Sequence, residues 1–176
     1  DKYIVSLLKA WYGDNATTEN SFGFNYLPKA KTGANYSHIP MIEGIAKGTI
    51  QGLWCWGQNP ASGGPASNGA RKALENLKWL VIADLWLNET AEFWRRPGVV
   101  PADIQTEVIV LPAAGSYEKE GSISNSGRWV QWRWKAVNPP GEAMPDLEIM
   151  NLVMLKLKEL YEADTTAPNR EAITKL

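Results

Sequence analysis

The sequence predicts an α/β fold: an open, mainly parallel sheet with helices on both faces (Rossmann-like αβα), plus an irregular N-terminal arm. Three observations lead to this prediction. Short apolar runs alternate with stretches of helical periodicity, the runs are continuously apolar, and the first 48 residues lack the pattern. Continuously apolar strands separated by helices are typical of a parallel sheet that is buried on both faces. We therefore expect right-handed crossover connections between the strands.

The first 48 residues are expected to form a helix, an irregular arm and a second helix. Apolar residues recur at helical spacing over residues 2–11. Residues 14–37 are polar and have no clear period, which is typical of an arm that crosses a surface. A second helix is predicted over residues 37–47, where Ser37 can cap its start and Gly48 can close its end.

Residues 49–164 carry the predicted sheet. The predicted strands are residues 49–56, 79–83 and 107–111, and the predicted crossover helices are residues 69–76 and 88–95. A further stretch, 128–134, alternates as an extended strand does. The last helix is expected to begin near Asp146 with a long apolar stripe, and residues 165–176 are expected to be a polar, frayed tail.

The composition argues against several classes of protein. The formal net charge is −1, which argues against nucleic-acid binding, and no apolar run approaches the roughly 20 residues needed to cross a membrane. The single cysteine, Cys55, argues against a disulfide or a cysteine-ligated iron–sulfur cluster, and the single histidine, His38, argues against a His/Cys zinc site. Because the chain starts at Asp1 rather than Met, we expect it to be cut from a longer polypeptide.

Nine tryptophans are an unusual number for this length, and six fall into two groups: Trp54, Trp56, Trp79 and Trp129, Trp132, Trp134. So much indole surface suggests packing against other parts of a larger assembly. The alternative is a free-standing module that binds a sugar or a mononucleotide through an aromatic platform.

Ligands of open parallel sheets bind beyond the carboxyl ends of the strands. The polar candidates fall at three such ends: Gly57, Gln58 and Asn59, then Ala83 and Asp84, then the stretch from Ala113. We expect these three ends to converge on a common nucleotide seat. Two competing interpretations stay open. The loop that begins at Gly57 could be an ordinary surface loop, and Asp84 could simply cap the turn that follows it.

No catalytic or metal-binding residue is predicted. Glu118 and Glu120 lack a neighbouring nucleophile or metal site, and His38 has no acidic partner nearby in the sequence. Cys55 lies mid-strand and is expected to be buried and inert. A hydrolase is disfavoured because the Gly-x-Ser-x-Gly elbow is absent from the sequence.

Several motifs follow one another along the chain: Gly57-Gln58-Asn59-Pro60, Asp84 with Asn88-Glu89-Thr90-Ala91, Val110-Leu111-Pro112, Glu118 to Gly121, and Asn125-Ser126-Gly127-Arg128. In order and spacing they resemble the molybdopterin oxidoreductases, the large subunits that carry molybdenum or tungsten on two molybdopterin guanine dinucleotides. Others are similar to the respiratory, periplasmic formate dehydrogenases: Gly13-Asp14-Asn15-Ala16-Thr17, Asp103-Ile104-Gln105-Thr106-Glu107-Val108 and Gly121-Ser122-Ile123.

The resemblance implies that the chain is a cofactor-binding segment of such a subunit, inactive alone, which holds one guanine dinucleotide limb. It implies cofactor contacts at Gly57, Gln58, Asn59, Ala83, Asp84, Thr90, Ala113, Lys119 and Asp146. Ala83 departs from the polar residue common in the family, so only its backbone can contribute. Asp146 could instead be a helix N-cap, and Lys119 a solvated charge.

The resemblance also implies cofactors and partners for the parent protein. The metal, molybdenum or tungsten, and the iron–sulfur clusters would be bound elsewhere, and the molybdopterin guanine dinucleotide itself is expected to be absent from the isolated segment. Implied partners are the remaining domains of the same subunit and an iron–sulfur subunit, with no nucleic acid and no membrane contact by this segment. The implied location of the parent is the periplasm.

Overall fold

The structure is a computed structural model that describes residues 2–176. It divides into two compact units, one of residues 2–34 and 150–176 and the other of residues 35–149. This division differs from the expected boundaries, since the chain leaves the first unit at residue 34 and returns to it at residue 150. The predicted site residues all fall in the second unit.

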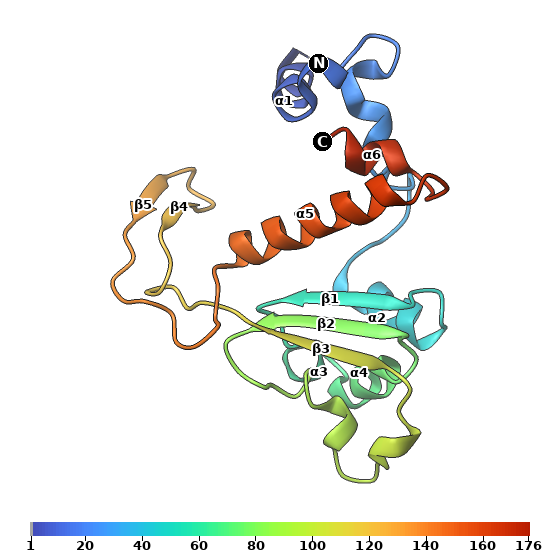
Figure 1. Ribbon diagram of the computed structural model, residues 1–176. Helices are drawn as coiled ribbons and strands as arrows, with labels where there is room; N and C mark the ends of the chain where they lie inside the picture. The colour runs from blue at the N-terminus through green and yellow to red at the C-terminus, as the bar shows by residue number, and fades with distance from the viewer. Residues whose placement is uncertain (1) are drawn as a thin grey trace. The chain divides into compact units, whose positions relative to one another are not determined.

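The second unit is built on a three-stranded parallel sheet (Figure 1). Its strands are β1 (Gly52–Trp56), β2 (Trp79–Asp84) and β3 (Glu107–Pro112), in the order β1-β2-β3. β2 is buried along most of its length, as its run of Leu, Val, Ile and Ala predicts. The three predicted strands are therefore confirmed, although the first begins at residue 52 rather than 49.

Three helices cover one face of this sheet: α2 (His38–Ala46), α3 (Pro60–Gly63) and α4 (Ser67–Leu74). The core between helices and sheet contains residues that are at least nine-tenths buried, among them Ile45, Leu74, Leu80, Ile82 and Phe93. Alternate strand residues point to one face of a sheet, so Leu80 and Ile82 of β2 enter the same core.

The other face is covered only in part. Helix α5 (Asp146–Ala163) begins there, and Ile149 packs with Ala83 and Ala113 near the carboxyl ends of the strands. Away from that end, Trp79 is 43% exposed and Ile109 is 42% exposed. The predicted α/β class with a parallel sheet flanked by helices is confirmed, and the cover over the two faces is unequal.

A two-stranded antiparallel pair follows the sheet, formed by β4 (Gly121–Ser124) and β5 (Val130–Arg133). The predicted extended stretch at 128–134 is thus confirmed. All four residues of β5 are exposed, as are Trp129 and Trp134 on either side of it. Trp132 and Trp134 meet edge to face, with ring planes 70° apart.

The first unit contains α1 (Lys2–Tyr12), the 3-10 turns η1 (Gly13–Asn15) and η2 (Ser21–Tyr26), most of α5, and α6 (Arg170–Thr174). Its small core is Leu8, Tyr12 and Ala16. Gly23, at a φ of +87°, lies against the Tyr12 ring, where a side chain would collide. The predicted first helix is confirmed, and the expected frayed tail instead forms α6.

Two local predictions are wrong. Residues 88–95 form a turn and a short 3-10 helix, η3 (Phe93–Arg95), rather than a regular helix. The side-chain oxygen of Asn88 caps a first turn by accepting the N–H groups of Thr90 and Ala91, but the Arg95 N–H then bonds the carbonyl of Glu92 in the 3-10 manner and Pro97 follows. Ser37 makes no side-chain capping bond at the start of α2; its own N–H donates to Asn35. A further 3-10 turn, η4 (Pro101–Asp103), precedes β3.

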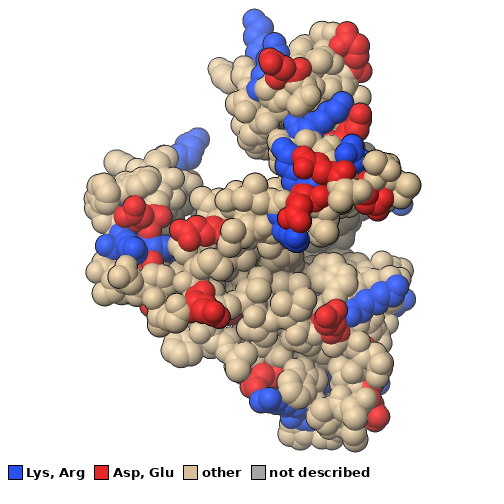
Figure 2. Space-filling view, in the orientation of Figure 1, with Lys and Arg blue, Asp and Glu red and all other residues tan. Residues whose placement is uncertain are grey.

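The surface shows no dominant charge. On the face drawn in Figure 2, acidic and basic side chains are interspersed, in keeping with a net charge of −1. Within residues 2–176, no helix combines the length and the apolarity that a membrane crossing requires.

Candidate functional site

The carboxyl ends of all three parallel strands meet at one edge of the sheet. The Gly57 N–H donates to the carbonyl of Ala83 over 2.9 Å, which joins the ends of β1 and β2. The Ala113 N–H donates to the carbonyl of Asp84 over 3.1 Å, which joins the ends of β2 and β3. The structure therefore brings together the three strand ends that the sequence analysis selected.

Asn59 is held by a network that crosses between the loops after β1 and β2. The hydroxyl of Thr90 donates to Asn59 Oδ1 over 2.8 Å and accepts the N–H of Ala61 over 3.0 Å. With Oδ1 bound to the Thr90 hydroxyl, Asn59 Nδ2 faces outward. There Nδ2 donates to Glu89 Oε2 over 2.5 Å. Thr90 is fully buried, so it positions Asn59 rather than facing a ligand.

Asp84 ends β2 and also organises the loop that follows. Its Oδ1 accepts the N–H of Leu85 and its Oδ2 accepts Nδ2 of Asn88, both over 2.7 Å. The capping role of Asp84 is thus present in the structure. Each carboxylate oxygen has further lone pairs, and Asp84 is partly exposed, so it can still accept bonds from a ligand.

Lys119 and Asp146 form an ion pair between the loop before β4 and the start of α5. Both side chains are about one-third exposed. On the same loop, the carboxylate of Glu118 accepts the N–H of Gly115 over 2.7 Å, which accounts for Glu118 without a catalytic role. Lys119 and Asp146, which the resemblance implies as two separate cofactor contacts, are therefore bound to each other.

The remaining predicted residues differ in exposure. Gly57 and Gln58 are exposed on the loop after β1, and Gly57 has the positive φ of +56° that favours glycine. Ala83 and Ala113 are buried beneath Ile149, with Ala83 0% exposed. The carbonyl of Ala83 is already bound to Gly57. These two alanines shape the floor under the strand ends and offer a ligand no side-chain surface.

A hollow of about 610 Å³ opens beside Gln58 and Asn59. The indoles of Trp54 and Trp56 contribute to its wall and stack with centroids 5.1 Å apart and planes within 8°. Cys55, between them, also lines it, and burial, aided by the charge of Asp84, raises the pKa of the Cys55 thiol to about 11. The thiol is therefore neutral near pH 7 and a poor nucleophile, as expected.

Two residues near Asn59 were missed by the sequence analysis as site residues, Arg71 and Glu89. Arg71 Nε donates to the carbonyl of Ala61 over 2.9 Å. The hydrogen bond from Asn59, with a smaller contribution from the charge of Arg71, holds the pKa of Glu89 below its usual value. No short-range signal marks this contact, because Asn59 and Glu89 lie on different loops.

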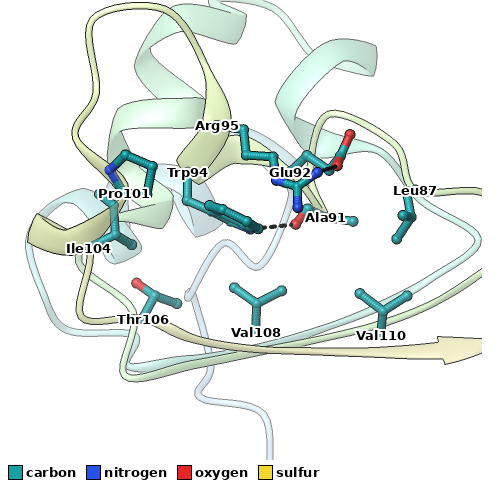
Figure 3. Close-up of a pocket in the computed structure, with 10 residues that line it drawn as sticks. All are labelled: Leu87, Ala91, Glu92, Trp94, Arg95, Pro101, Ile104, Thr106, Val108 and Val110. Carbon is teal, nitrogen blue, oxygen red and sulfur yellow. Dashed lines mark hydrogen bonds and ion pairs between the residues drawn. The ribbon is translucent and has the colours of Figure 1, made fainter.

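A second hollow of about 310 Å³ lies beside β3 (Figure 3). Val108 and Val110 of β3, and Thr106 just before it, point toward the loop that carries Trp94. Trp94 Nε1 donates to the carbonyl of Ala91 over 3.1 Å. The wall of this hollow is largely apolar and contains none of the residues predicted to bind a cofactor.

Among residues 2–176, no three His, Cys, Asp or Glu side chains gather in a way that could hold a metal ion. The polar groups at the strand ends are instead an amide, a guanidinium, an ammonium and carboxylates. This set suits a polar ligand with phosphate and hydroxyl groups better than a metal ion.

Comparison with known proteins identifies the family. The model of the molybdopterin oxidoreductases matches residues 4–155. The chain belongs to the molybdopterin oxidoreductase family. Membership implies a molybdopterin cofactor that carries molybdenum or tungsten.

Among curated proteins, formate dehydrogenase large subunits are similar to this molybdopterin oxidoreductase chain. Formate dehydrogenase 2 subunit alpha (cytochrome c-553) of Nitratidesulfovibrio vulgaris is 45% identical over 93% of this chain and 16% of its own length. The formate dehydrogenase major subunit of Haemophilus influenzae is 42% identical, and the nitrate-inducible major subunit of Escherichia coli is 41% identical, each over 93% of this chain and 16% of its own length. The chain therefore spans about a sixth of the length of these relatives.

The strand ends of this molybdopterin oxidoreductase chain fit the polar tail of such a cofactor. Asn59 Nδ2 already binds an anionic oxygen, that of Glu89, and the charge of Arg71 acts on the same carboxylate. Amide and guanidinium N–H groups are donors that can bind a phosphate oxygen.

Proposed function

We propose that this chain is the cofactor-binding segment of a formate dehydrogenase large subunit and holds one guanine dinucleotide limb of the molybdopterin cofactor. The observation that carries the proposal is the convergence of three strand ends at one edge, joined through the Gly57–Ala83 and Asp84–Ala113 backbone bonds. In open parallel sheets this edge is where nucleotides bind.

Each side chain at the edge has a role that its chemistry allows. Asn59 and Gln58 donate amide N–H groups toward phosphate oxygens, and Asp84 accepts hydrogen bonds from the guanosine. Lys119 contributes positive charge to the dinucleotide tail, while Asp146 keeps its ammonium in place. Gly57 and Thr90 set the loop geometry, while Ala83 and Ala113 form the floor.

In the parent subunit, the bound metal cofactor supplies the redox chemistry, in which formate gives carbon dioxide, a proton and two electrons that pass to iron–sulfur clusters. The residues of this chain bind and orient the dinucleotide tail rather than make or break substrate bonds. The proposal includes an iron–sulfur partner subunit and a periplasmic location for the parent, by analogy with the resembled enzymes.

We further propose that other domains of the same large subunit cover the exposed apolar surface of this chain. Trp129 and Trp134 are 71% and 75% exposed, and α5 leaves Leu152 and Leu155 more than half exposed. Apolar patches of this kind mark interaction surfaces. The relatives are about six times as long as this chain, which provides the domains that could pack there.

The alternative of a sugar-binding platform is less well supported. Such a platform needs exposed, coplanar indoles beside polar groups. Trp132 and Trp134 are exposed but inclined by 70°, while the coplanar pair, Trp54 and Trp56, is only partly exposed. No tryptophan pair in the described chain combines both properties.

Calorimetry with guanosine diphosphate tests the proposal. We expect weak binding by the isolated chain, since the cofactor of the family is enclosed by several domains, and submicromolar affinity would contradict this. Asp84→Asn should weaken guanosine diphosphate binding without weakening inorganic pyrophosphate binding, because only the guanosine is proposed to donate to Asp84. The matched control is Glu107→Gln, which removes one charge at the opposite end of the sheet.

An activity measurement complements the binding experiment. Mixing the chain with formate and a dye acceptor should give no dye reduction, because the reacting centre of the proposed parent would be held by its other domains. Turnover under these conditions would show that the assignment as a holding segment is wrong.

A further inference from the structure

Glu89 occupies the position in which a bound phosphate would meet Asn59. Its carboxylate oxygen lies 2.5 Å from Asn59 Nδ2, and the charge of Arg71 acts on the same carboxylate. Glu89 itself is exposed, so it could move away without exposing any core. The contact therefore joins an anionic side chain to donors that an anionic ligand needs.

The orientation of the Asn59 amide makes this contact specific. Thr90 donates its hydroxyl proton to Asn59 Oδ1, and the carboxylate of Glu89, which can only accept, lies at Nδ2, so the two contacts together define one amide orientation. Nδ2 therefore faces outward, toward an acceptor. In the absence of a ligand, Glu89 is that acceptor.

We propose that Glu89 is an internal substitute for phosphate, a displaceable anion that covers Asn59 and must swing away when the dinucleotide tail binds. This inference rests on the proposed function, because it names the residue that competes with the ligand at the same seat. Glu89 thereby pairs the outward-facing donor of Asn59 when the seat is empty and lowers the affinity for anions that bind weakly.

The competition has a direction that can be measured. A phosphate oxygen that replaces the carboxylate gains the Asn59 bond only after the Glu89 bond is lost, and the displaced negative charge remains nearby. At a separation of about 5 Å in water, one unit of like charge weakens binding about fourfold per charge on the ligand. Two charges of pyrophosphate at that distance would give about sixteenfold, and screening by salt reduces the expected effect to about tenfold.

The experiment measures inorganic pyrophosphate binding to the intact chain by calorimetry, with the Asn59 side-chain amide followed by nitrogen-15 NMR. Glu89→Gln removes the charge but retains an acceptor for Asn59, while Glu89→Ala removes both. We expect affinity to rise from wild type to Glu89→Gln and again to Glu89→Ala, about tenfold in all. The Asn59 amide signals should shift with pyrophosphate at lower concentrations in both variants.

Glu107→Gln is the matched control, because it removes the same charge from an exposed position at the far end of β3. An equal gain in that variant would show a bulk charge effect and overturn the inference. Equal affinity of Glu89→Ala and wild type would overturn it as well, as would an Asn59 amide that never responds.

Guanosine diphosphate in parallel separates this inference from the proposed function. If Glu89→Ala tightens pyrophosphate but guanosine adds no affinity, the guanine-nucleotide function fails and the role of Glu89 stands. If guanosine diphosphate binds at Asp84 while Glu89→Ala changes nothing, the proposed function stands and the role of Glu89 fails. Absence of binding in every variant contradicts both.

Discussion

Replacing Thr90 by valine should destabilise the fold, because the Thr90 hydroxyl joins the loops after β1 and β2. Valine has nearly the same shape but cannot donate to Asn59 or accept from the N–H of Ala61. The lost bond to Asn59 is worth about 1 kcal/mol, and the unsatisfied N–H of Ala61 costs about 1–3 kcal/mol, because Thr90 and Ala61 are both fully buried. The expected loss in the free energy of unfolding is about 2–4 kcal/mol.

Urea denaturation followed by tryptophan fluorescence measures this loss. With a slope of about 2 kcal/mol per molar urea, the midpoint should fall by about 1–2 M. Thr90→Ser retains the hydroxyl and separates the hydrogen bonds from packing. Thr49→Val removes an exposed hydroxyl that donates to the carbonyl of Gly44 and should cost less than about 1 kcal/mol, because water can replace the lost partner. If Thr90→Val matched Thr49→Val, the network around Asn59 would not hold the two loops together.

Three further predictions concern the reactivity of the Cys55 thiol, its effect on the pH dependence of stability, and the ion pair between Lys119 and Asp146. Alkylation of Cys55 in the native chain should be slow at pH 8 and fast in urea, because its raised pKa of about 11 keeps the thiol protonated, and a rate equal to that of a free thiol would contradict this. The unfolded thiol loses its proton near pH 9 and the folded thiol near pH 11, so the contribution of Cys55 to stability should fall as pH rises through this window. Denaturation midpoints of wild type and Cys55→Ala, measured at pH 8 and pH 10, check this. Lys119→Met should lower the free energy of unfolding by less than about 1 kcal/mol, because the ion pair with Asp146 is partly solvated. In 1 M salt the variant should be as stable as wild type. A larger loss that does not depend on salt would indicate a structural role for the Lys119 ammonium.

The parallel sheet was predictable because its strands are short, continuously apolar and separated by polar loops. β2 and β3 begin at the predicted residues, Trp79 and Glu107, and extend one residue further than predicted. The pattern could not show that the two faces are covered unequally, since an exposed Ile109 and a buried Val81 look alike in a sequence. Whether a face of the sheet is covered depends on where the helices before and after the strands pack.

The convergence of the strand ends followed from the parallel topology, so Asn59, Asp84 and Ala113 were selected correctly as neighbours of one edge. The contact between Asn59 and Glu89 could not be predicted, because it joins residues 30 positions apart on two loops. The predicted helix at 88–95 failed for a different reason. Asn88 caps a single turn, which continues only as a 3-10 helix up to the residues before Pro97, and the apolar spacing alone does not distinguish this short turn from a regular helix.

The central claim is that the ends of β1, β2 and β3 form a single nucleotide seat. The most direct test is a nitrogen-15 NMR titration of the chain with guanosine diphosphate, in which every backbone amide reports separately. The account predicts that the shifted amides cluster at residues 57–59, 84–89 and 113–119. Shifts confined to the tryptophans of β5, or spread evenly over the chain, would contradict it.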